Sequence, residues 1–165
     1  MATSSSAIRH RNTGFSLLEL LAAAAIIGLL ASVAVPFVET TVKRQKEREL
    51  RTALRDIRQA IDAYKHAVAT GHIATKLELS GYPPSLTELV GGVEDLANKT
   101  GPKLYFLRRI PRDPFAADAT ATAIQTWGVR SFASEPDNPA VGDDVFDVYS
   151  LSARTGLNGV PYREW

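Results

Sequence analysis

The sequence predicts an α+β fold in which one long N-terminal helix packs on a small antiparallel sheet. Three observations predict it: an apolar run near the N-terminus, a following stretch with apolar residues at every third or fourth position, and a C-terminal part with turn formers and short strand-like segments. A length of 165 residues allows one compact domain besides a membrane segment. We therefore expect a single small globular domain carried by the helix.

The apolar run extends from residue 15 to residue 38, and Glu19 is its only charged side chain. About 20 apolar residues are enough for a helix to cross the hydrocarbon core of a bilayer. Arg9 and Arg11 precede the run, and basic residues on that side place the N-terminus in the cytoplasm. The part after Val38 is therefore predicted to be extracytoplasmic.

Composition alone leaves three interpretations of the run open: a cleaved secretory signal, an uncleaved signal anchor, and a short leader whose helix is retained. A secretory signal needs small residues at a cleavage site after its apolar region. Residues 31–34 (Ala-Ser-Val-Ala) offer such a site, but the run continues to Val38. The residues at the start of the run favour the third interpretation.

Residues 14–21, Gly-Phe-Ser-Leu-Leu-Glu-Leu-Leu, resemble the prepilin peptidase recognition motif of the type IV pilin superfamily. The resemblance implies cleavage after Gly14, a mature chain that begins at Phe15, and methylation of the new Phe15 amine. It also implies three parts. These are a leader (residues 1–14), a transmembrane and filament-core helix (15–38), and a periplasmic globular domain (39–165) that includes the amphipathic second half of the helix.

Glu19 requires an explanation, because an acidic side chain inside a membrane helix costs about 2.5 to 3.5 kcal/mol on insertion scales. Its place one turn into the span would let it reach the interface and interact with the positive end of the helix. In pilins the equivalent glutamate pairs with the N-terminal amine of a neighbouring subunit, so the resemblance implies a role of Glu19 in subunit assembly.

The resemblance likewise implies that Gly28 and Pro36 frame a segment that loses helical hydrogen bonds during assembly. Considered without the resemblance, Gly28 and Pro36 are tolerated interruptions of a membrane helix.

Beyond Pro36 the pattern becomes that of an amphipathic helix. Apolar side chains recur at steps of three or four residues from Leu50 to Val68, and Gly71 is predicted to end the helix. The members of this apolar series are Leu50, Leu54, Ile57, Ile61, Tyr64 and Val68.

The opposite side of this helix is predicted to be a solvated, charged face. Glu39 with Lys43 and Glu47 with Arg51 are spaced for ion pairs one turn apart. The charged residues are Lys43, Arg44, Lys46, Glu47, Arg48, Arg51, Arg55 and Arg58.

After Gly71 the chain is rich in turn formers, and its elements are short. A helix is predicted over residues 85–90, where Ser85 and Glu88 have the spacing of a capping box. Residues 156–159 (Gly-Leu-Asn-Gly) are predicted to form a turn. The predicted strands are Leu104–Leu107, Ile124–Arg130 and Val145–Leu151.

Several blocks in this part resemble, in their order, the major pseudopilin of type II secretion systems. They are residues 60–65 (AIDAYK), 81–84 (GYPP), 110–115 (IPRDPF), 146–151 (FDVYSL) and Trp165. The resemblance implies a type IV pilin-like fold and a structural subunit that polymerises into a periplasmic pseudopilus. Its implied partners are further copies of itself, minor pseudopilins, prepilin peptidase, and an inner-membrane assembly platform with its ATPase. A longer connection at residues 71–81 and Phe115-Ala116 in place of Trp-Gly depart from the family pattern.

The family commonly holds a calcium ion in a loop just after the Tyr-Ser-Leu block. Residues 152–155 of this chain read Ser-Ala-Arg-Thr, and an arginine there disfavours a cation that takes six to eight oxygen ligands. A nearby acidic stretch offers a displaced site, although acidic residues in loops are commonly solvated turn formers. No cofactor or metal ligand is therefore predicted. The stretch contains Glu135, Asp137, Asp143, Asp144 and Asp147.

Neither catalysis nor nucleic-acid binding is predicted. The formal net charge of +1 gives no reason to expect a polyanionic partner, and the sequence contains no cysteine for a disulfide or a thiolate site. His10, His66 and His72 have no recognisable partner spacing, and no nucleophile elbow or phosphate-binding loop occurs. The chain is expected to be a substrate of the peptidase and not itself an enzyme.

Two alternatives remain open. A type IV pilin for adhesion, motility or DNA uptake would share the leader and helix, although the missing cysteines and the Tyr-Ser-Leu block favour secretion. A non-polymerising, membrane-anchored binding module would keep Gly14 and tolerate replacement of Glu19. A secreted enzyme would instead require cleavage after the apolar run.

Overall fold

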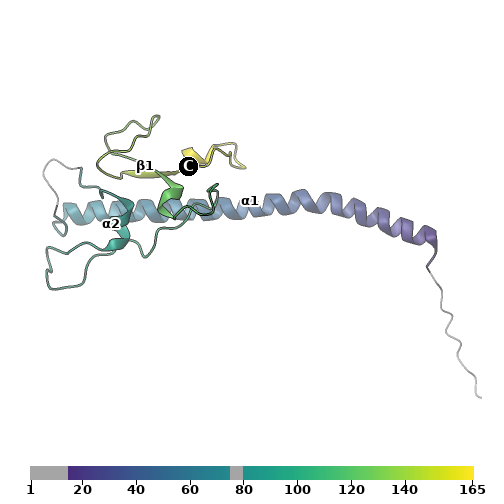
Figure 1. Cartoon of the computed structure of the whole chain (residues 1–165), viewed down its shortest axis with the longest axis horizontal. Helices are drawn as coiled ribbons and strands as arrows, with labels where there is room; N and C mark the ends of the chain where they lie inside the picture. The colour runs from purple at the N-terminus through teal and green to yellow at the C-terminus, as the bar shows by residue number, and fades with distance from the viewer. Residues whose placement is uncertain (1–14, 75–79) are drawn as a thin grey trace, which may run out of the picture. The chain divides into compact units, whose positions relative to one another are not determined.

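The computed structural model of the protein describes residues 15–74 and 80–165 (Figure 1). Its regular elements are helix α1 (Leu17–Ala69), helix α2 (Leu86–Gly91), strand β1 (Trp127–Arg130), strand β2 (Asp147–Ser150) and two 3-10 helices, η1 (Ile124–Thr126) and η2 (Tyr162–Glu164). The predicted α+β class is confirmed. The predicted leader, including Gly14 and His10, lies outside the described residues.

The chain divides into two compact units, one ending at Thr41 and one comprising Val42–Trp165. We call them the N-terminal unit and the globular unit. Helix α1 contributes its first part to the N-terminal unit and its second part to the globular unit.

In the N-terminal unit, α1 begins where the apolar run begins. Ser16 caps the helix: its hydroxyl oxygen accepts the N–H of Leu18 at 3.3 Å, and its carbonyl oxygen accepts the N–H of Leu20 at 3.1 Å. The backbone remains helical through Gly28 and Pro36.

In the globular unit, α1 supplies one side of the hydrophobic core. The predicted apolar series is confirmed, since Leu50, Ile57 and Ile61 are fully buried. The helix ends in a Schellman motif around Gly71, whose φ is 78°. There the N–H of His72 donates to the carbonyl of Ala67 at 2.9 Å, a backbone geometry that favours glycine at the position before it.

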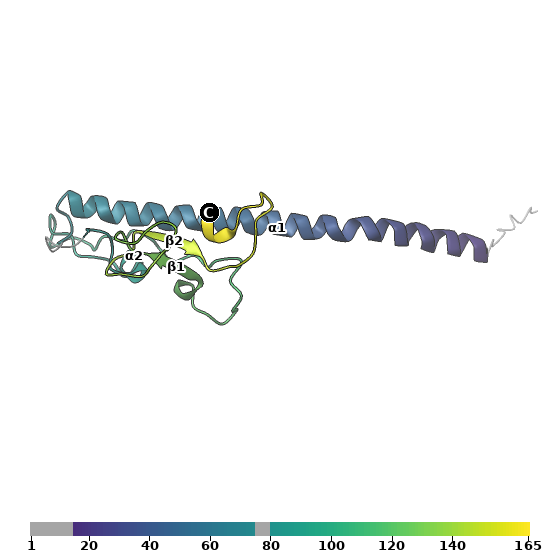
Figure 2. The same ribbon diagram turned by 90° about the horizontal axis from the view of Figure 1, so that it is seen from above.

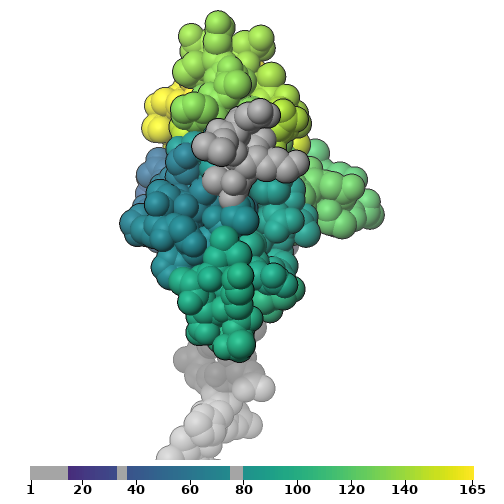
Figure 3. Space-filling model, turned by 90° about the vertical axis from the view of Figure 1, so that its left-hand side faces the viewer, coloured from purple at the N-terminus to yellow at the C-terminus, as the bar shows by residue number. Residues whose placement is uncertain are grey.

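The sheet consists of two antiparallel strands, with Trp127 opposite Ser150 and Arg130 opposite Asp147. In Figure 2, β1, β2 and α2 lie along one side of α1 within the globular unit. Figure 3 shows the end of this unit, where the connection between β1 and β2 and the segment after α2 form opposite edges of the surface. Val148, Leu86 and Leu89 complete the core under α1.

The predicted strand at Leu104–Leu107 is wrong. Only Leu104 forms an isolated bridge, with Val93. The N–H groups of Phe106 and Leu107 both donate to the carbonyl of Leu89, at 3.1 and 2.9 Å. The backbone N–H groups of Phe106 and Leu107 are therefore satisfied by helix α2, and the segment pairs with no strand.

The two other predicted strands are present but shorter than predicted. The segment 124–130 begins as η1, because the Thr126 hydroxyl donates to the carbonyl of Ala123 at 2.6 Å and stabilises a turn there. The segment 145–151 pairs as a strand only over β2, and the N–H of Val145 donates instead to the carbonyl of Pro83 at 2.8 Å.

Three predicted side-chain interactions do not form. Helix α2 occurs where a helix was predicted, but the Ser85 side chain makes no capping hydrogen bond. Within the described residues, neither predicted ion pair of the charged face of α1 forms. The pair of Glu47 with Arg51 does not form because Glu47 points into the globular unit and is only 7% exposed. The charged face of α1 is therefore not solvated throughout.

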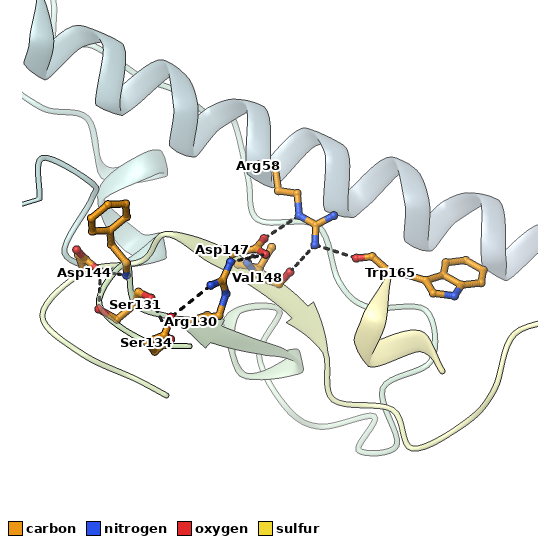
Figure 4. Close-up of polar contacts among 9 residues, drawn as sticks. Arg58, Arg130, Ser131, Ser134, Asp144, Asp147, Val148 and Trp165 are labelled. Carbon is orange, nitrogen blue, oxygen red and sulfur yellow. Dashed lines mark hydrogen bonds and ion pairs between the residues drawn. The ribbon is translucent and has the colours of Figure 1, made fainter. Parts of the chain in front are cut away.

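Arg58 fastens the sheet to α1 (Figure 4). Its Nε donates to Oδ1 of Asp147 at 2.7 Å, and its terminal nitrogen donates to the carbonyl oxygens of Val148 at 3.2 Å and Trp165 at 2.8 Å. A guanidinium suits this role because its five N–H groups form a rigid fork. One side chain of the helix therefore positions both β2 and the segment around Trp165.

We predict that Arg58→Ala lowers the free energy of unfolding of the globular unit by about 2 kcal/mol, because hydrogen bonds to a charged group are lost. Chemical denaturation of the full chain in detergent, followed by tryptophan fluorescence, measures the change. The matched control is Arg55→Ala, which removes an exposed arginine of the same helix. Equal effects of the two substitutions would contradict the role of Arg58.

Candidate functional site

The first part of α1, together with Phe15 before it, presents an apolar surface whose side chains are exposed among the described residues. Its large hydrophobic side chains are 57–77% exposed, a condition that soluble proteins avoid over such a length. The helix is long and apolar enough to cross a membrane, as predicted. The exposed side chains are Phe15, Leu17, Leu18, Leu20, Leu21, Ile26, Ile27, Leu29, Leu30, Phe37 and Val38.

Phe15 and Glu19 lie at the same end of this surface. Phe15 precedes the helix, and Glu19 is the acidic residue of the first turn of α1. The Glu19 side chain is exposed and has no ion-pair partner among the residues that the structure describes. A carboxylate in the first turn interacts favourably with the positive end of the helix, so its position is compatible with both explanations given above.

Gly28 and Pro36 lie within continuous helix, but the backbone hydrogen bonding between them is altered. The hydroxyl of Ser32 donates to the carbonyl oxygen of Gly28 at 2.9 Å, in competition with the normal helical bond. Pro36 has no N–H to donate, so the carbonyl of Ser32 loses its partner one turn later. The segment 28–36 is helical, with one hydroxyl bond added at Gly28 and one backbone donor missing at Pro36.

The loop after β2 does not fit a calcium ion. The guanidinium carbon of Arg154 lies 5.5 Å from the centroid of the Phe115 ring, and Nζ of Lys46 lies 6.0 Å from the same centroid. Two positive charges therefore lie beside this loop. Calcium requires several anionic and carbonyl oxygens, and residues 152–155 supply no carboxylate.

The acidic stretch does not form a displaced metal site either. Asp144 and Asp147 both have occupied oxygens: those of Asp147 face Arg58 at 2.7 Å and Arg130 at 3.6 Å. Across residues 15–74 and 80–165, no three acidic or histidine side chains come together as metal ligands would. The remaining carboxylates of the stretch, Glu135, Asp137 and Asp143, are exposed.

Asp144 ties the connection between the strands to the rest of the globular unit (Figure 4). Its Oδ1 accepts the hydroxyl of Ser131 and the N–H of Phe132, each at 2.8 Å, and its Oδ2 accepts the hydroxyl of Ser80. Burial alone would raise the pKa of the Asp144 carboxyl. The hydrogen bonds from these three groups, helped by the charge of Lys65, outweigh burial and hold that pKa below its usual range.

One histidine differs from expectation. His72 has a partner: its Nδ1 lies 2.9 Å from Oδ1 of Asp95, and this hydrogen bond is the main cause of the lowered pKa of the Asp95 carboxyl. The two residues lie where α1 has ended and where the segment after α2 returns toward it. His66 is exposed on α1.

Sequence reasoning missed the buried carboxylates. Asp113 is 1% exposed; its oxygens accept the hydroxyl of Ser150 at 2.5 Å and the N–H of Phe115 at 2.7 Å. Glu47 lies three residues before Leu50, so the apolar series extended backwards would have indicated that position 47 faces the core. No comparable periodic signal exists for Asp113, which lies in a loop.

The N-terminal part of the chain matches a known family profile. A family profile described as the prokaryotic N-terminal methylation motif matches residues 9–35, which include Gly14, Phe15 and Glu19. The chain therefore carries the N-terminal signature of proteins that are methylated at a processed N-terminus.

Over most of its length the chain is similar to type II secretion system core protein G. It is 26% identical to that protein of Dickeya chrysanthemi over 160 residues, 92% of this chain and 97% of the relative. It is 28% identical to that of Klebsiella pneumoniae over 142 residues, 82% and 94% of the two chains, and 29% identical to that of Vibrio cholerae over 113 residues, 66% and 69%. No solved structure matches the chain significantly. The resemblance inferred from the sequence is confirmed.

We predict that acid destabilises the globular unit partly through Asp144. The lowered pKa of its carboxyl stabilises the fold at pH values above its ordinary 3.8, and this stabilisation is lost as pH falls through the lower folded-state value. Asp144→Asn should therefore flatten the fall in unfolding free energy between about pH 5 and pH 2. Denaturation curves at stepped pH test this, with Asp143→Asn as the control at an exposed neighbour; equal curves for both variants would contradict the prediction.

Proposed function

We propose that the chain is a structural pseudopilin subunit that polymerises into a periplasmic pseudopilus and so drives type II protein secretion. Residues 1–14 are the leader, residues 15–38 the transmembrane and filament-core helix, and residues 39–165 the periplasmic globular domain. The N-terminus lies in the cytoplasm and the subunit is stored in the bacterial inner membrane. The observation that carries this proposal is the exposed apolar surface of α1 behind a methylation motif.

The apolar surface explains both storage and assembly. Lipid covers it in the membrane, and the same surfaces of neighbouring subunits cover it in a filament core. The transfer exchanges one apolar environment for another, so an external source of work must extract the subunit. We assign that work to the ATPase of the inner-membrane assembly platform.

Cleavage after Gly14 supplies the chemical partner that Glu19 needs. It creates the Phe15 amine, which remains basic after methylation and carries a positive charge. In a filament core of low dielectric, an unpaired Glu19 carboxylate would be costly, and so would an unpaired amine. Pairing Glu19 of one subunit with the Phe15 amine of a neighbour satisfies both groups and selects the axial position at which the helices pack.

Gly28 and Pro36 supply the flexibility of this helix. The competing Ser32 hydroxyl and the missing Pro36 donor lower the cost of unwinding the segment between them. Local unwinding lets the apolar helix adjust its length and direction as subunits pack, while the globular unit keeps its own fold.

The remaining partners follow from this role. The prepilin peptidase cleaves and methylates the subunit, minor pseudopilins join the filament, and the growing pseudopilus pushes exoproteins toward an outer-membrane channel. The chain itself carries no reaction in this scheme. Its similarity to core protein G favours secretion over a pilus for adhesion, motility or DNA uptake.

We predict that the chain isolated from membranes begins at Phe15 with one methyl group on its amine. Intact-mass and N-terminal peptide mass spectrometry, in cells with and without prepilin peptidase, measure this directly. An uncut chain in both strains would favour a membrane-anchored binding module. A chain that starts beyond Ala34 would be a secreted protein and would contradict the proposed assembly.

We predict that Glu19→Ala reduces the yield of assembled filaments by about tenfold or more, because the neighbouring Phe15 amine is left without its carboxylate. Crosslinking in intact cells, followed by separation of the crosslinked multimers by size, measures the yield. The matched control is Glu39→Ala, which removes an exposed carboxylate of α1 beyond the apolar run. Normal filaments from Glu19→Ala would refute the pairing, and normal subunit levels are required for the comparison.

A further inference from the structure

The segment after β2, residues 151–161, has almost no regular structure of its own. We call it the C-terminal loop. Its backbone forms an isolated bridge between Thr155 and Pro161, and a tight turn in which the N–H of Gly159 donates to the carbonyl of Gly156 at 3.1 Å. Most of its side chains are exposed, including Leu151 and Leu157. Burial of apolar surface within the loop is therefore too small to hold it in place.

The carboxylate of Glu47, on helix α1, binds the C-terminal loop. Oε1 of Glu47 accepts two hydrogen bonds, from the N–H of Leu157 at 2.7 Å and from the hydroxyl of Tyr162 at 3.0 Å. Glu47 is 7% exposed and Tyr162 is fully buried, so the bond between these two side chains is buried, whereas the bond from Leu157 is part-buried. The N–H of Tyr162 donates to the carbonyl of Arg154 at 3.1 Å, which closes the loop at its far end.

Aromatic and cationic contacts surround these two hydrogen bonds. The rings of Tyr162 and Phe115 stack with centroids 4.1 Å apart, and Arg154 and Lys46 approach the same Phe115 ring. Tyr162 and these two cationic side chains therefore pack on the same aromatic ring.

The titration of Tyr162 agrees with this geometry. Burial, together with the hydrogen bond and the negative charge of Glu47, raises the pKa of the Tyr162 hydroxyl to about 12, against the opposing effect of Arg154. The hydroxyl therefore keeps its proton and its role as a donor over the whole physiological pH range.

We propose that Glu47 and Arg154 fasten the C-terminal loop in place of a divalent cation, so that this chain folds independently of calcium, unlike the family it resembles. The physical task is the same in both arrangements: an irregular loop must be joined to the rest of the domain by charge. Here the Glu47 carboxylate joins the loop through two hydrogen bonds, and the Arg154 side chain packs on Phe115. A calcium ion near Arg154 and Lys46 would meet repulsion and would find no free carboxylate in the loop.

We call the contacts of Glu47 and Arg154 that fasten the C-terminal loop the lock. The lock concerns the folding of the globular unit alone, so its test is separate from the test of assembly. The first measurement is hydrogen exchange with mass spectrometry on the full chain in detergent, in excess calcium and in excess EGTA. We expect equal exchange of residues 151–161 and an equal Tm in both solutions. Slower exchange of the loop, or a Tm several degrees higher in calcium, would overturn the proposal.

The second measurement tests the side chains of the lock. We expect Glu47→Ala to accelerate exchange of residues 151–161 by about tenfold, since one acceptor served two donors there. Tyr162→Phe should accelerate it less, because the Leu157 bond remains, and it decides the matter if Glu47→Ala does not fold. The control is Asp56→Ala, an exposed carboxylate of the same helix. Unchanged loop exchange in Tyr162→Phe and in folded Glu47→Ala would refute the lock.

Discussion

Helix α1 has to satisfy two different environments along one uninterrupted element, and the rest of the structure depends on this constraint. Up to Val38 its side chains are apolar on every side apart from Glu19 and the small Ser32, a composition that suits lipid or the interior of a helix bundle. From Leu50 onward only one side is apolar, and that side forms the core of the globular unit. The change of pattern along the helix separates the exposed apolar surface from the surface that packs in the globular unit.

Buried polar contacts add to the hydrophobic core in holding the globular unit together. Outside α1, α2 and the two short strands, much of this unit is irregular. Buried or half-buried acidic side chains fasten these irregular segments: Asp113 next to Phe115, Asp144 between the strands, Asp147 against Arg58, and Glu47 at the C-terminal loop. Each carboxylate accepts hydrogen bonds from backbone or side-chain donors that find no acceptor within a helix or sheet.

These contacts also bear on how the chain departs from its relatives. Where the sequence lacks acidic residues after the Tyr-Ser-Leu block, the structure places Arg154 over Phe115 and turns Glu47 toward the loop. A metal ion brings its charge only when it is bound, whereas these side chains are always present. A subunit that passes between compartments of different calcium content would fold in the same way in each.

The sequence alone determined the features that depend on local pattern: the apolar run, the amphipathic series from Leu50, the helix end at Gly71, and the α+β class. Their physical basis is the fixed period of a helix and the conformational freedom of glycine, which act within a few residues. Only the tertiary structure decided which charges are buried and where the strands pair. Residues 104–107 form no strand, because two of their backbone N–H groups donate to helix α2, and Glu47 is buried in the globular unit and does not lie on the solvated face. Both outcomes depend on partners elsewhere in the chain: the carbonyl of Leu89 accepts from residues 106 and 107, and Leu157 and Tyr162 donate to Glu47. The spacing from Leu50 indicates the direction of Glu47, but no local pattern encodes these partners.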